Sequence, residues 1–327
     1  MCQVESPEAL TVLPLNMLGK VLLRHVERMP NAKVVWNANV LDVGTEGDKA
    51  WAKVKFQDGR EERVEADYVC GCDGANSQVR KSLFGDSYPG KTWDAQIIAT
   101  NVYYPFEKFG YDDMNFIIHP EHYYMAARIT RDGLWRVSYG ENTNLNLEQV
   151  HENQPRKFEV MLPGHPKPHE YKLLNANPYK IHQRCATNFR VGRVVLAADA
   201  AHLCNPFGGL GLTGGIVDVG GLFECLDGIQ KGLADDSILD KYDEVRRAMW
   251  HDVIDTVSSD NFRRVSATDP ETAREKDPWL VLVEKANRDP ELKKEVDQTM
   301  YGICHDFTQY YNKKQGTAKP TAQSPKL

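Results

Sequence analysis

The sequence has no apolar run that approaches the ~20 residues needed to cross a bilayer, so we expect no transmembrane segment. Its start, MCQVESPEAL, lacks the basic region and the long apolar stretch of a secretion signal. An excess of positive charge is also missing, and the formal net charge of −6 argues against nucleic acid as a partner. The 7 cysteines are scattered and odd in number, which is typical of a reducing, cytoplasmic compartment.

Metal ligands at suitable spacing are scarce. Only Cys70 and Cys72 lie close together, and we interpret them as buried thiols within an apolar strand. A metal site would need further cysteine or histidine pairs at ligand spacing, which the sequence does not offer, so we expect none. The chain is 41% apolar and 26% charged, as in ordinary globular proteins, and its 327 residues can form two domains.

The first third of the chain predicts alternating helices and strands. LPLNMLGKVLLRHVERMP repeats leucine at helical spacing and predicts a helix that Pro30 stops. KVVWNANVLDV (33–43) and AWAKVKF (50–56) predict strands separated by a turn. A further strand leads into Asp73 and Gly74, and a short helix follows from 75 to 83.

The middle of the chain predicts a different kind of secondary structure. Between 93 and 184, aromatic and β-branched residues alternate with polar ones, which is typical of an antiparallel sheet, with one helix near 146–161. RVVLAAD (193–199) is a continuous apolar strand of the kind buried in a parallel sheet. A long amphipathic helix then runs from Ser237, its expected N-cap, to Val265.

Asp199 and the glycines after it form the most informative segment, GRVVLAADAAHLCNPFGGLGLTGG (192–215). An aspartate at the end of a parallel strand lies where α/β sheets place ligand-binding side chains, and its carboxylate can accept hydrogen bonds from sugar hydroxyls. Glycines let a flat ring approach the main chain, and free N–H groups at a helix start favour an electron-rich oxygen. The alternative is a tight turn in which Asp199 caps the backbone and the glycines allow close helix packing.

GLGLTG (209–214) matches the G-x-G-x-x-G dinucleotide fingerprint but lies ten residues beyond the strand rather than directly after it. A nicotinamide dehydrogenase that uses this loop is therefore the third-ranked hypothesis. His202 has two readings, a packed histidine or a catalytic base.

The segment 192–215 resembles the second flavin motif of the class A flavoprotein monooxygenases, the group that contains para-hydroxybenzoate hydroxylase and phenol 2-monooxygenase. DYVCGCDGANSQVRKSLFG (67–85) resembles the other internal motif of that family, and a β-rich segment separates the two as expected. The resemblance covers most of 11–265 and is closest to the fungal members that act on aromatic or polyketide-like substrates. It implies an α/β fold in which a Rossmann-like FAD-binding domain, incomplete at its N-terminus, is interrupted by an antiparallel β-sheet substrate domain.

The domain boundaries follow from this reading. We expect the FAD-binding domain, without its first βαβ unit, at 1–91 and 184–268, and the β-rich substrate domain at 92–183. A C-terminal helical region is expected at 269–316, and the polar, Pro-rich residues 317–327 are expected to be a disordered tail.

The resemblance also implies positions for the cofactors. Asp199 would bind the ribityl chain or the pyrophosphate side of FAD, and Pro206 would line the isoalloxazine. The neighbouring backbone would offer N–H groups to the ring oxygens, from Gly208, Gly209, Gly211 and Leu212. The first motif and the early helix would supply further contacts: Asp73 and Gly74 near the pyrophosphate and the NADPH path, Arg80 as a phosphate partner, and Asn16 as a weaker FAD contact.

The substrate pocket would be walled by the aromatic strands. Its candidate residues are Phe116, His119, His122, Tyr123, Tyr124, Met125 and Arg128, of which we retain His122, Tyr124 and Arg128. A tyrosine or histidine among them could deprotonate a phenol, but the sequence does not single out the catalytic base. An ordinary sheet face is the alternative for each residue.

The predicted function is therefore an FAD-dependent, NAD(P)H-consuming monooxygenase that hydroxylates an aromatic or polyketide-like small molecule, in fungal secondary metabolism or degradation. A homodimer is compatible with this function. Two departures from the family pattern bear on it. Ala198 replaces the usual glycine, which is tolerable if its φ is negative. The family's opening strand–GxGxxG–helix segment is missing, which predicts exposed apolar strand edges and leaves a truncated, non-catalytic remnant as the alternative.

Overall fold

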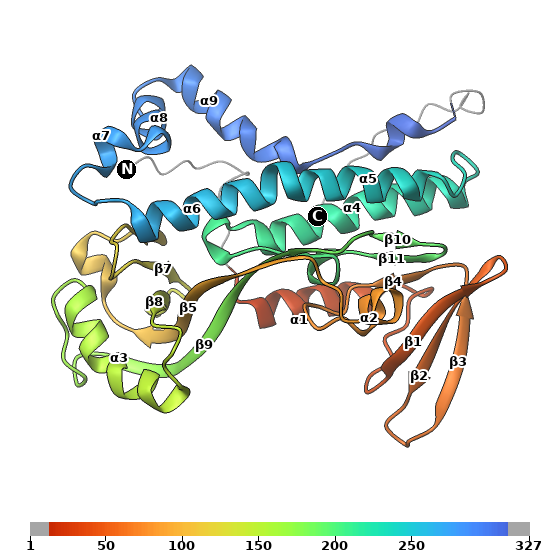
Figure 1. Ribbon diagram of the computed structural model, residues 1–327, viewed down its shortest axis with the longest axis horizontal. Coiled ribbons are helices and arrows are strands. Elements are labelled where there is room, and N and C mark those ends of the chain that lie inside the picture. Colours follow the sequence, from red (N-terminus) through yellow and green to blue (C-terminus); the bar gives the residue numbers. More distant parts are fainter. Residues whose placement is uncertain (1–12, 313–327) are drawn as a thin grey trace.

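The computed structural model describes residues 13–312, which form three sheets with helices on either side (Figure 1). The strands are β1 (Asn39–Glu46), β2 (Lys49–Lys55), β3 (Glu61–Ala66), β4 (Val69–Gly71), β5 (Gly90–Tyr103), β6 (Met114–Ile117), β7 (Tyr124–Arg128), β8 (Leu134–Glu141), β9 (Lys172–Cys185), β10 (Arg190–Val191), β11 (Val194–Leu196) and β12 (His202–Leu203). The helices are α1 (Leu15–Val26), α2 (Gln78–Phe84), α3 (Leu147–Met161), α4 (Leu210–Gln230), α5 (Ile238–Met249), α6 (Thr256–Ala267), α7 (Ala273–Lys276), α8 (Pro278–Ala286) and α9 (Pro290–Thr299). The predicted tail, 317–327, lies outside the described residues.

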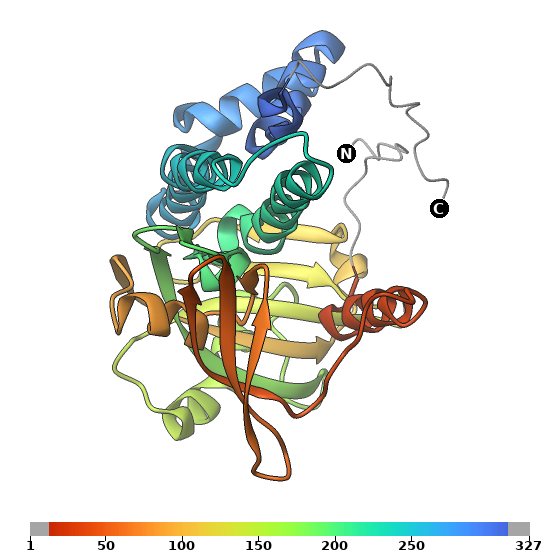
Figure 2. The ribbon, with the colours of Figure 1, turned by 90° about the vertical axis from the view of Figure 1, so that its right-hand side faces the viewer.

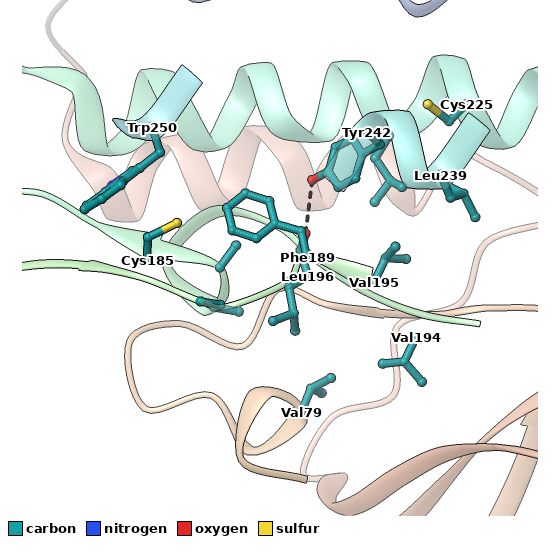
Figure 3. Packing of buried hydrophobic residues seen from close by; sticks show 14 of the residues in the cluster. Val79, Cys185, Phe189, Val194, Val195, Leu196, Cys225, Leu239, Tyr242 and Trp250 are labelled. Atoms are coloured by element: carbon teal, nitrogen blue, oxygen red, sulfur yellow. Dashed lines mark hydrogen bonds between the residues drawn. The ribbon is translucent and has the colours of Figure 1, made fainter. Parts of the chain in front are cut away.

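A small sheet in the order β10-β11-β4 contains the strand that precedes Asp199. β11 pairs in parallel with β4, and all three of its residues are buried, as the continuous apolar run predicted. Figure 3 shows Leu239 and Tyr242 of α5 on one side of β11 and Val79 of α2 on the other. The Tyr242 hydroxyl donates a hydrogen bond to the Leu196 carbonyl (3.0 Å), which ties α5 to the end of the strand.

The exposed edge of this sheet corrects one prediction. Cys70 and Cys72 are both exposed, rather than buried as we expected. The physical reason is that β4 pairs only with β11 among residues 13–312, so its other edge has no neighbouring strand. The expectation of exposed apolar strand edges is wrong for β11, which has a neighbouring strand on each side and is buried.

The large antiparallel sheet has the order β12-β9-β5-β8-β7-β6 and runs from Gly90 to Cys185, with β12 added at one edge. Helix α3 covers one face, where Val150 and Phe158 are fully buried against the strands. Its N-cap Asn146 accepts a hydrogen bond from the Gln149 backbone in a capping box, so the predicted helix is confirmed. The parallel and antiparallel sheets together confirm the α/β fold class. The division of the chain into domains stays a prediction.

Strands β1, β2 and β3 form a separate antiparallel sheet at one end of the molecule, the end that faces the viewer in Figure 2. The predicted strand at 33–43 is only partly correct, because β1 begins at Asn39. Asn37 has a left-handed backbone (φ 56°), which turns the chain and prevents the preceding apolar residues from joining the strand.

The predicted long helix is continuous but contains an irregular turn. α5 and α6 are joined by one π-helical turn, Trp250–Asp255, which adds a residue to the backbone spacing. Ser237 does not cap α5, because its hydroxyl donates to the Asp235 carboxylate instead. Among the described helices, none combines the length and the apolar character required of a membrane span.

Candidate functional site

Asp199 lies in a single 3-10 turn, Ala198–Ala200, that follows β11. The residue is exposed, and its carboxylate accepts no hydrogen bond from any residue between 13 and 312. Partial burial raises the pKa of this carboxyl above its ordinary value, although the nearby His202 lowers it. Within residues 13–312, Asp199 is therefore an acceptor group without a protein partner at the end of a parallel strand.

Ala198 has a left-handed backbone, with φ at 54°, so the condition of a negative φ, under which alanine would be tolerable here, is not met. An L-residue with a Cβ pays about 1–2 kcal/mol for this conformation. Two features accommodate it. The Ala198 backbone N–H donates to the Asp218 carboxylate (2.9 Å), and its Cβ faces Gly215, where an added Cβ would stand only 2.7 Å away.

Asp218 belongs to a buried polar cluster under this turn. Its side chain is fully buried and accepts from His202 Nε2 at 2.7 Å and from Arg246 Nε at 2.6 Å. Burial alone would raise the pKa of the Asp218 carboxyl, but the hydrogen bonds and charges of His202 and Arg246 hold it below the ordinary value. His202 is thus a packed, partnered histidine in this structure, as its first reading proposed.

The segment after the turn leads into α4 through a second 3-10 turn, Pro206–Gly208. Gly209 has a left-handed backbone (φ 65°) and precedes α4, whose first N–H groups receive no side-chain cap. Space is open at Gly209 and at Gly211, whereas a Cβ at Gly208 would lie 2.8 Å from Ser258. Gly208 therefore serves packing, while Gly209 and Gly211 leave bare backbone and free donors at a helix N-terminus.

GLGLTG does not form a dinucleotide loop. Gly211 and Gly214 lie inside α4, and the segment follows a 3-10 turn rather than a strand. The geometry that the fingerprint requires is absent from this segment.

The residues predicted from the first motif have protein partners of their own. The Asp73 carboxylate caps α2 by accepting from the Ser77 hydroxyl and the Gln78 and Val79 backbone N–H groups, and Gly74 has a left-handed φ of 82°. Arg80 is buried, so the structure does not leave its guanidinium free as a phosphate partner. It donates to the carbonyls of Ala200 (2.9 Å) and Ala75 (2.8 Å) and lies over the Tyr88 ring.

Asn16 and Arg128 are far apart in sequence but line the same cavity, of about 990 Å³, between the start of α1 and the large sheet. Ala127 and Arg136, which are cross-strand partners in β7 and β8, contribute to the same wall. Arg128 also pairs with Asp113 at 3.2 Å.

His122 and Tyr124 do not reach this cavity. His122 lines a polar hollow of about 330 Å³ with Glu141 and Lys157, on the side of α3. Tyr124 is buried in the core beneath α3, where its hydroxyl pairs with that of Tyr111. The structure thus does not bring these two predicted substrate residues together with Asp199 or Pro206.

The turn at Pro206 packs on the opposite face of the large sheet from the face that Tyr124 and α3 occupy. Phe207 is buried against the rings of Tyr123 (5.9 Å), Phe116 (6.5 Å) and Phe262 (5.4 Å). Side chains alternate along a strand, so Tyr123, Met125 and Ala127 share this face while Tyr124 points to the other. The sequence showed the alternation but not which face the turn would cover.

Sequence reasoning missed Asp218 and Arg246. A signal was available, because Asp218 stands alone in the otherwise apolar and glycine-rich segment GGIVDVGGL, and a charge in such surroundings is usually buried and paired. Its partner on α5 could not be identified without the fold.

Three comparisons with known proteins agree with this geometry. A family model described as the FAD binding domain matches residues 2–257. Para-nitrophenol 4-monooxygenase of a Pseudomonas species is 38% identical over 256 residues, covering 78% of this chain and 63% of that protein. A 6-hydroxy-3-succinoylpyridine 3-monooxygenase of Pseudomonas putida is 31% identical over 295 residues, covering 90% and 72%.

Among solved structures, p-nitrophenol 4-monooxygenase from Pseudomonas putida is similar with a TM-score of 0.82 and 33% identity, covering 89% of this chain and 72% of that one. Aklavinone-11 hydroxylase with FAD and aklavinone shares the fold at 20% identity and a TM-score of 0.67, covering 80% and 49%. The chain therefore spans about two thirds of the length of the first relatives, 63% and 72%. These relatives come from bacteria, so the expected closeness to fungal members is not supported. Because the family model matches most of its length, the chain belongs to the FAD-binding-domain family of flavin-dependent aromatic monooxygenases.

Proposed function

We propose that this chain binds FAD and acts as a monooxygenase on an aromatic small molecule, with NAD(P)H as the electron donor. The observation that carries the proposal is the combination of the Asp199 carboxylate, which has no hydrogen-bond partner among residues 13–312, with the bare, uncapped start of α4. A carboxylate that accepts from sugar hydroxyls and a helix N-terminus that donates to an electron-rich oxygen together suit a ligand with both kinds of group. FAD has a ribityl chain and a ring with carbonyl oxygens, so the residues present fit it.

In this proposal FAD would lie with its ribityl hydroxyls at Asp199 and its ring over Gly209 and Gly211. When bound, it supplies the redox chemistry that activates oxygen for transfer to an electron-rich ring. Gly209 and Gly211 contribute backbone N–H groups and no side chain, so a ring can approach the main chain closely. Pro206 and the buried Phe207 beside it would restrict access of water to that ring.

The substrate is proposed to enter the cavity of about 990 Å³ that Asn16, Ala127 and Arg136 help to line. This cavity opens on the same sheet face that Phe207 contacts, because Ala127 lies two residues after Met125 and four after Tyr123 on that face. Burial raises the pKa of Tyr123 to about 12, so its hydroxyl stays protonated at neutral pH and can donate a hydrogen bond but does not act as a base.

The proposal is tested by adding FAD to the purified chain and following the visible flavin spectrum, then NADPH oxidation with 4-nitrophenol as the probe. We expect a bound flavin spectrum and NADPH oxidation that depends on the phenol. Replacing Ala127 with phenylalanine should narrow the cavity, which raises KM for the phenol several-fold and leaves FAD affinity unchanged. A folded chain that binds no FAD even at a high FAD concentration would contradict the proposal.

A further inference from the structure

The turn that presents Asp199 is held at several backbone positions. The Ala198 N–H donates to Asp218 (2.9 Å), Tyr88 donates to the Asp199 carbonyl (3.2 Å), and Arg80 donates to the Ala200 carbonyl (2.9 Å). The last two contacts hold the chain after Ala198. The contact with Asp218 is different, since it fixes the N–H of the strained residue itself.

Nothing inside Ala198 stabilises its left-handed conformation. Its Cβ makes φ of 54° unfavourable, and no ring or bond inside the residue enforces it. The hydrogen bonds on both sides of Ala198 oppose a change of this conformation. A change of φ must displace either the peptide before Ala198, which leaves the buried Asp218 carboxylate with one acceptor site empty, or the chain after it, which Tyr88 and Arg80 hold. The position of the Asp199 side chain depends directly on the φ of the preceding residue.

The Asp218 carboxylate accepts hydrogen bonds from three groups. Oδ2 of Asp218 accepts both from the Ala198 backbone and from His202, and Oδ1 accepts from Arg246, which in turn donates to the Ile303 carbonyl at 2.7 Å. Both Asp218 and Arg246 have no exposed side-chain area. Asp218 is therefore a rigid acceptor, anchored to α5 and to the segment at Ile303.

We infer that Asp218 is a positioning residue for flavin binding: it holds Ala198 in its left-handed conformation and thereby aims the Asp199 carboxylate at the ligand. The inference rests on the proposed function for its ligand, FAD. It also explains how an alanine can occupy a position that glycine would fill without strain, because Asp218 and Gly215 together compensate for the added methyl group.

The test compares FAD dissociation constants of four proteins. Asp218→Asn should raise the constant about tenfold, because a charge-assisted bond becomes a neutral one. The double variant Asp218→Asn with Ala198→Gly should return to within about threefold of the wild type, because glycine adopts the turn without help. Asp243→Asn is the matched control on α5, since Asp243 is buried, accepts from the Phe189 N–H and pairs with Arg247. The FAD dissociation constant of Asp243→Asn should equal that of the wild type.

Asp218→Asn leaves Arg246 charged and buried, so this variant could fail to fold. The variant Asp218→Leu with Arg246→Met removes both charges and still deprives Ala198 of its acceptor. A second measurement, hydrogen exchange at the Ala198 amide without flavin, should show protection in the wild type and at least tenfold faster exchange in this double variant, because the N–H has lost its partner.

Unchanged FAD affinity in the folded Asp218 variants would overturn the inference, and so would an equal loss in Asp243→Asn or no recovery with Ala198→Gly. If the wild type binds no FAD, the proposed function fails and the flavin part of the inference fails with it, and the exchange rate at Ala198 then decides only whether Asp218 holds the turn. Fast exchange at Ala198 in the wild type would overturn it.

Discussion

Asp199 differs from the other aspartates of the site because its carboxylate has no hydrogen-bond partner in the part of the chain that the structure describes. Asp73 caps α2, and Asp218 is enclosed by His202, Arg246 and the Ala198 N–H. These three aspartates show that the same residue type can serve structure or ligand binding according to its partners. Only a carboxylate with spare acceptor capacity can bind the hydroxyls of an incoming ligand.

Replacing Asp199 with alanine should weaken FAD binding by roughly 10- to 100-fold, since one charge-assisted hydrogen bond contributes about 1.5–3 kcal/mol. Thermal stability without flavin should change little, because no described residue bonds to this carboxylate. Flavin fluorescence quenching measures the affinity. Asp297→Ala, at an exposed ion pair on α9, serves as the control and should bind FAD normally. Equal affinities for all three proteins would contradict the role of Asp199.

Asp218 predicts a specific dependence of stability on pH. Its folded-state pKa is lowered, so its contribution to stability is complete above the unfolded value of about 3.9 and is lost as the pH falls through the folded value. Urea unfolding of Asp218→Asn should therefore show a deficit of roughly 3–5 kcal/mol near pH 7, because Arg246 loses its partner, and a smaller deficit at acid pH. A deficit that grows toward acid pH would contradict this assignment.

Individual residues were predictable from the sequence when their role depends on the chain nearby. Asp199 follows its strand and is free, and Gly209 and Gly211 have open space, as their pattern indicated. Tyr124 was not predictable, because one position along a strand decides which face it occupies. Arg80 was not either, since its carbonyl partner at Ala200 is 120 residues away.

The glycines of helix α4 differ in their surroundings. Gly214, Gly215 and Asp218 are buried toward the Asp199 turn, while Gly211 at the start and Gly220 further along have no atom near their missing Cβ. Glycine is a poor helix former, so an open glycine in a helix has either a ligand to accommodate or no role.

Gly211→Ala and Gly220→Ala form a matched pair on α4. Both should stabilise the flavin-free chain by up to about 1 kcal/mol, because alanine is the better helix former and neither methyl group meets another atom. Only Gly211→Ala should weaken FAD binding, by about tenfold or more, because its methyl group stands on the proposed approach of the ring. Urea unfolding and flavin titration measure the two effects. Loss of affinity in both variants, or in neither, would show that Gly211 does not face the ligand.

Gly215 and Ala198 should be coupled across the same contact. Gly215→Ala places a methyl group 2.7 Å from the Ala198 Cβ and should destabilise the chain by about 1–3 kcal/mol. Adding Ala198→Gly removes the opposing methyl group and should restore most of that loss. A double-mutant cycle in urea measures the coupling, and additive effects would mean that the two residues do not touch.

Helices and strands were predicted best where the pattern is local. The apolar run before Asp199 and the capped helix at Asn146 form as expected. The π turn at Trp250–Asp255 was not predicted, because the apolar spacing of a helix hardly changes when one residue is inserted. β1 begins later than expected, since a left-handed Asn37 interrupts the apolar run.

The whole molecule places the proposed flavin contacts between its two main sheets. β11 of the small sheet leads into the Asp199 turn, and the turn at Pro206 then packs Phe207 on the large sheet and on Phe262 of α6. The α/β class could be predicted from the order of elements, because parallel and antiparallel strands have different patterns. The mutual placement of α1 and the large sheet, which creates the cavity at Asn16 and Arg128, could not, since it depends on contacts between distant segments.

Titration of the purified chain with FAD, followed by both the flavin spectrum and thermal unfolding, tests the central claim most directly. Saturable binding to the wild type should raise the stability by about 2.7 kcal/mol at a FAD concentration 100 times the dissociation constant. Asp199→Ala and Gly211→Ala should lose about half of this gain or more at the same FAD concentration while keeping their fold. If the folded wild type shows neither a perturbed flavin spectrum nor any stabilisation by FAD, then Asp199 and the start of α4 do not form a flavin site.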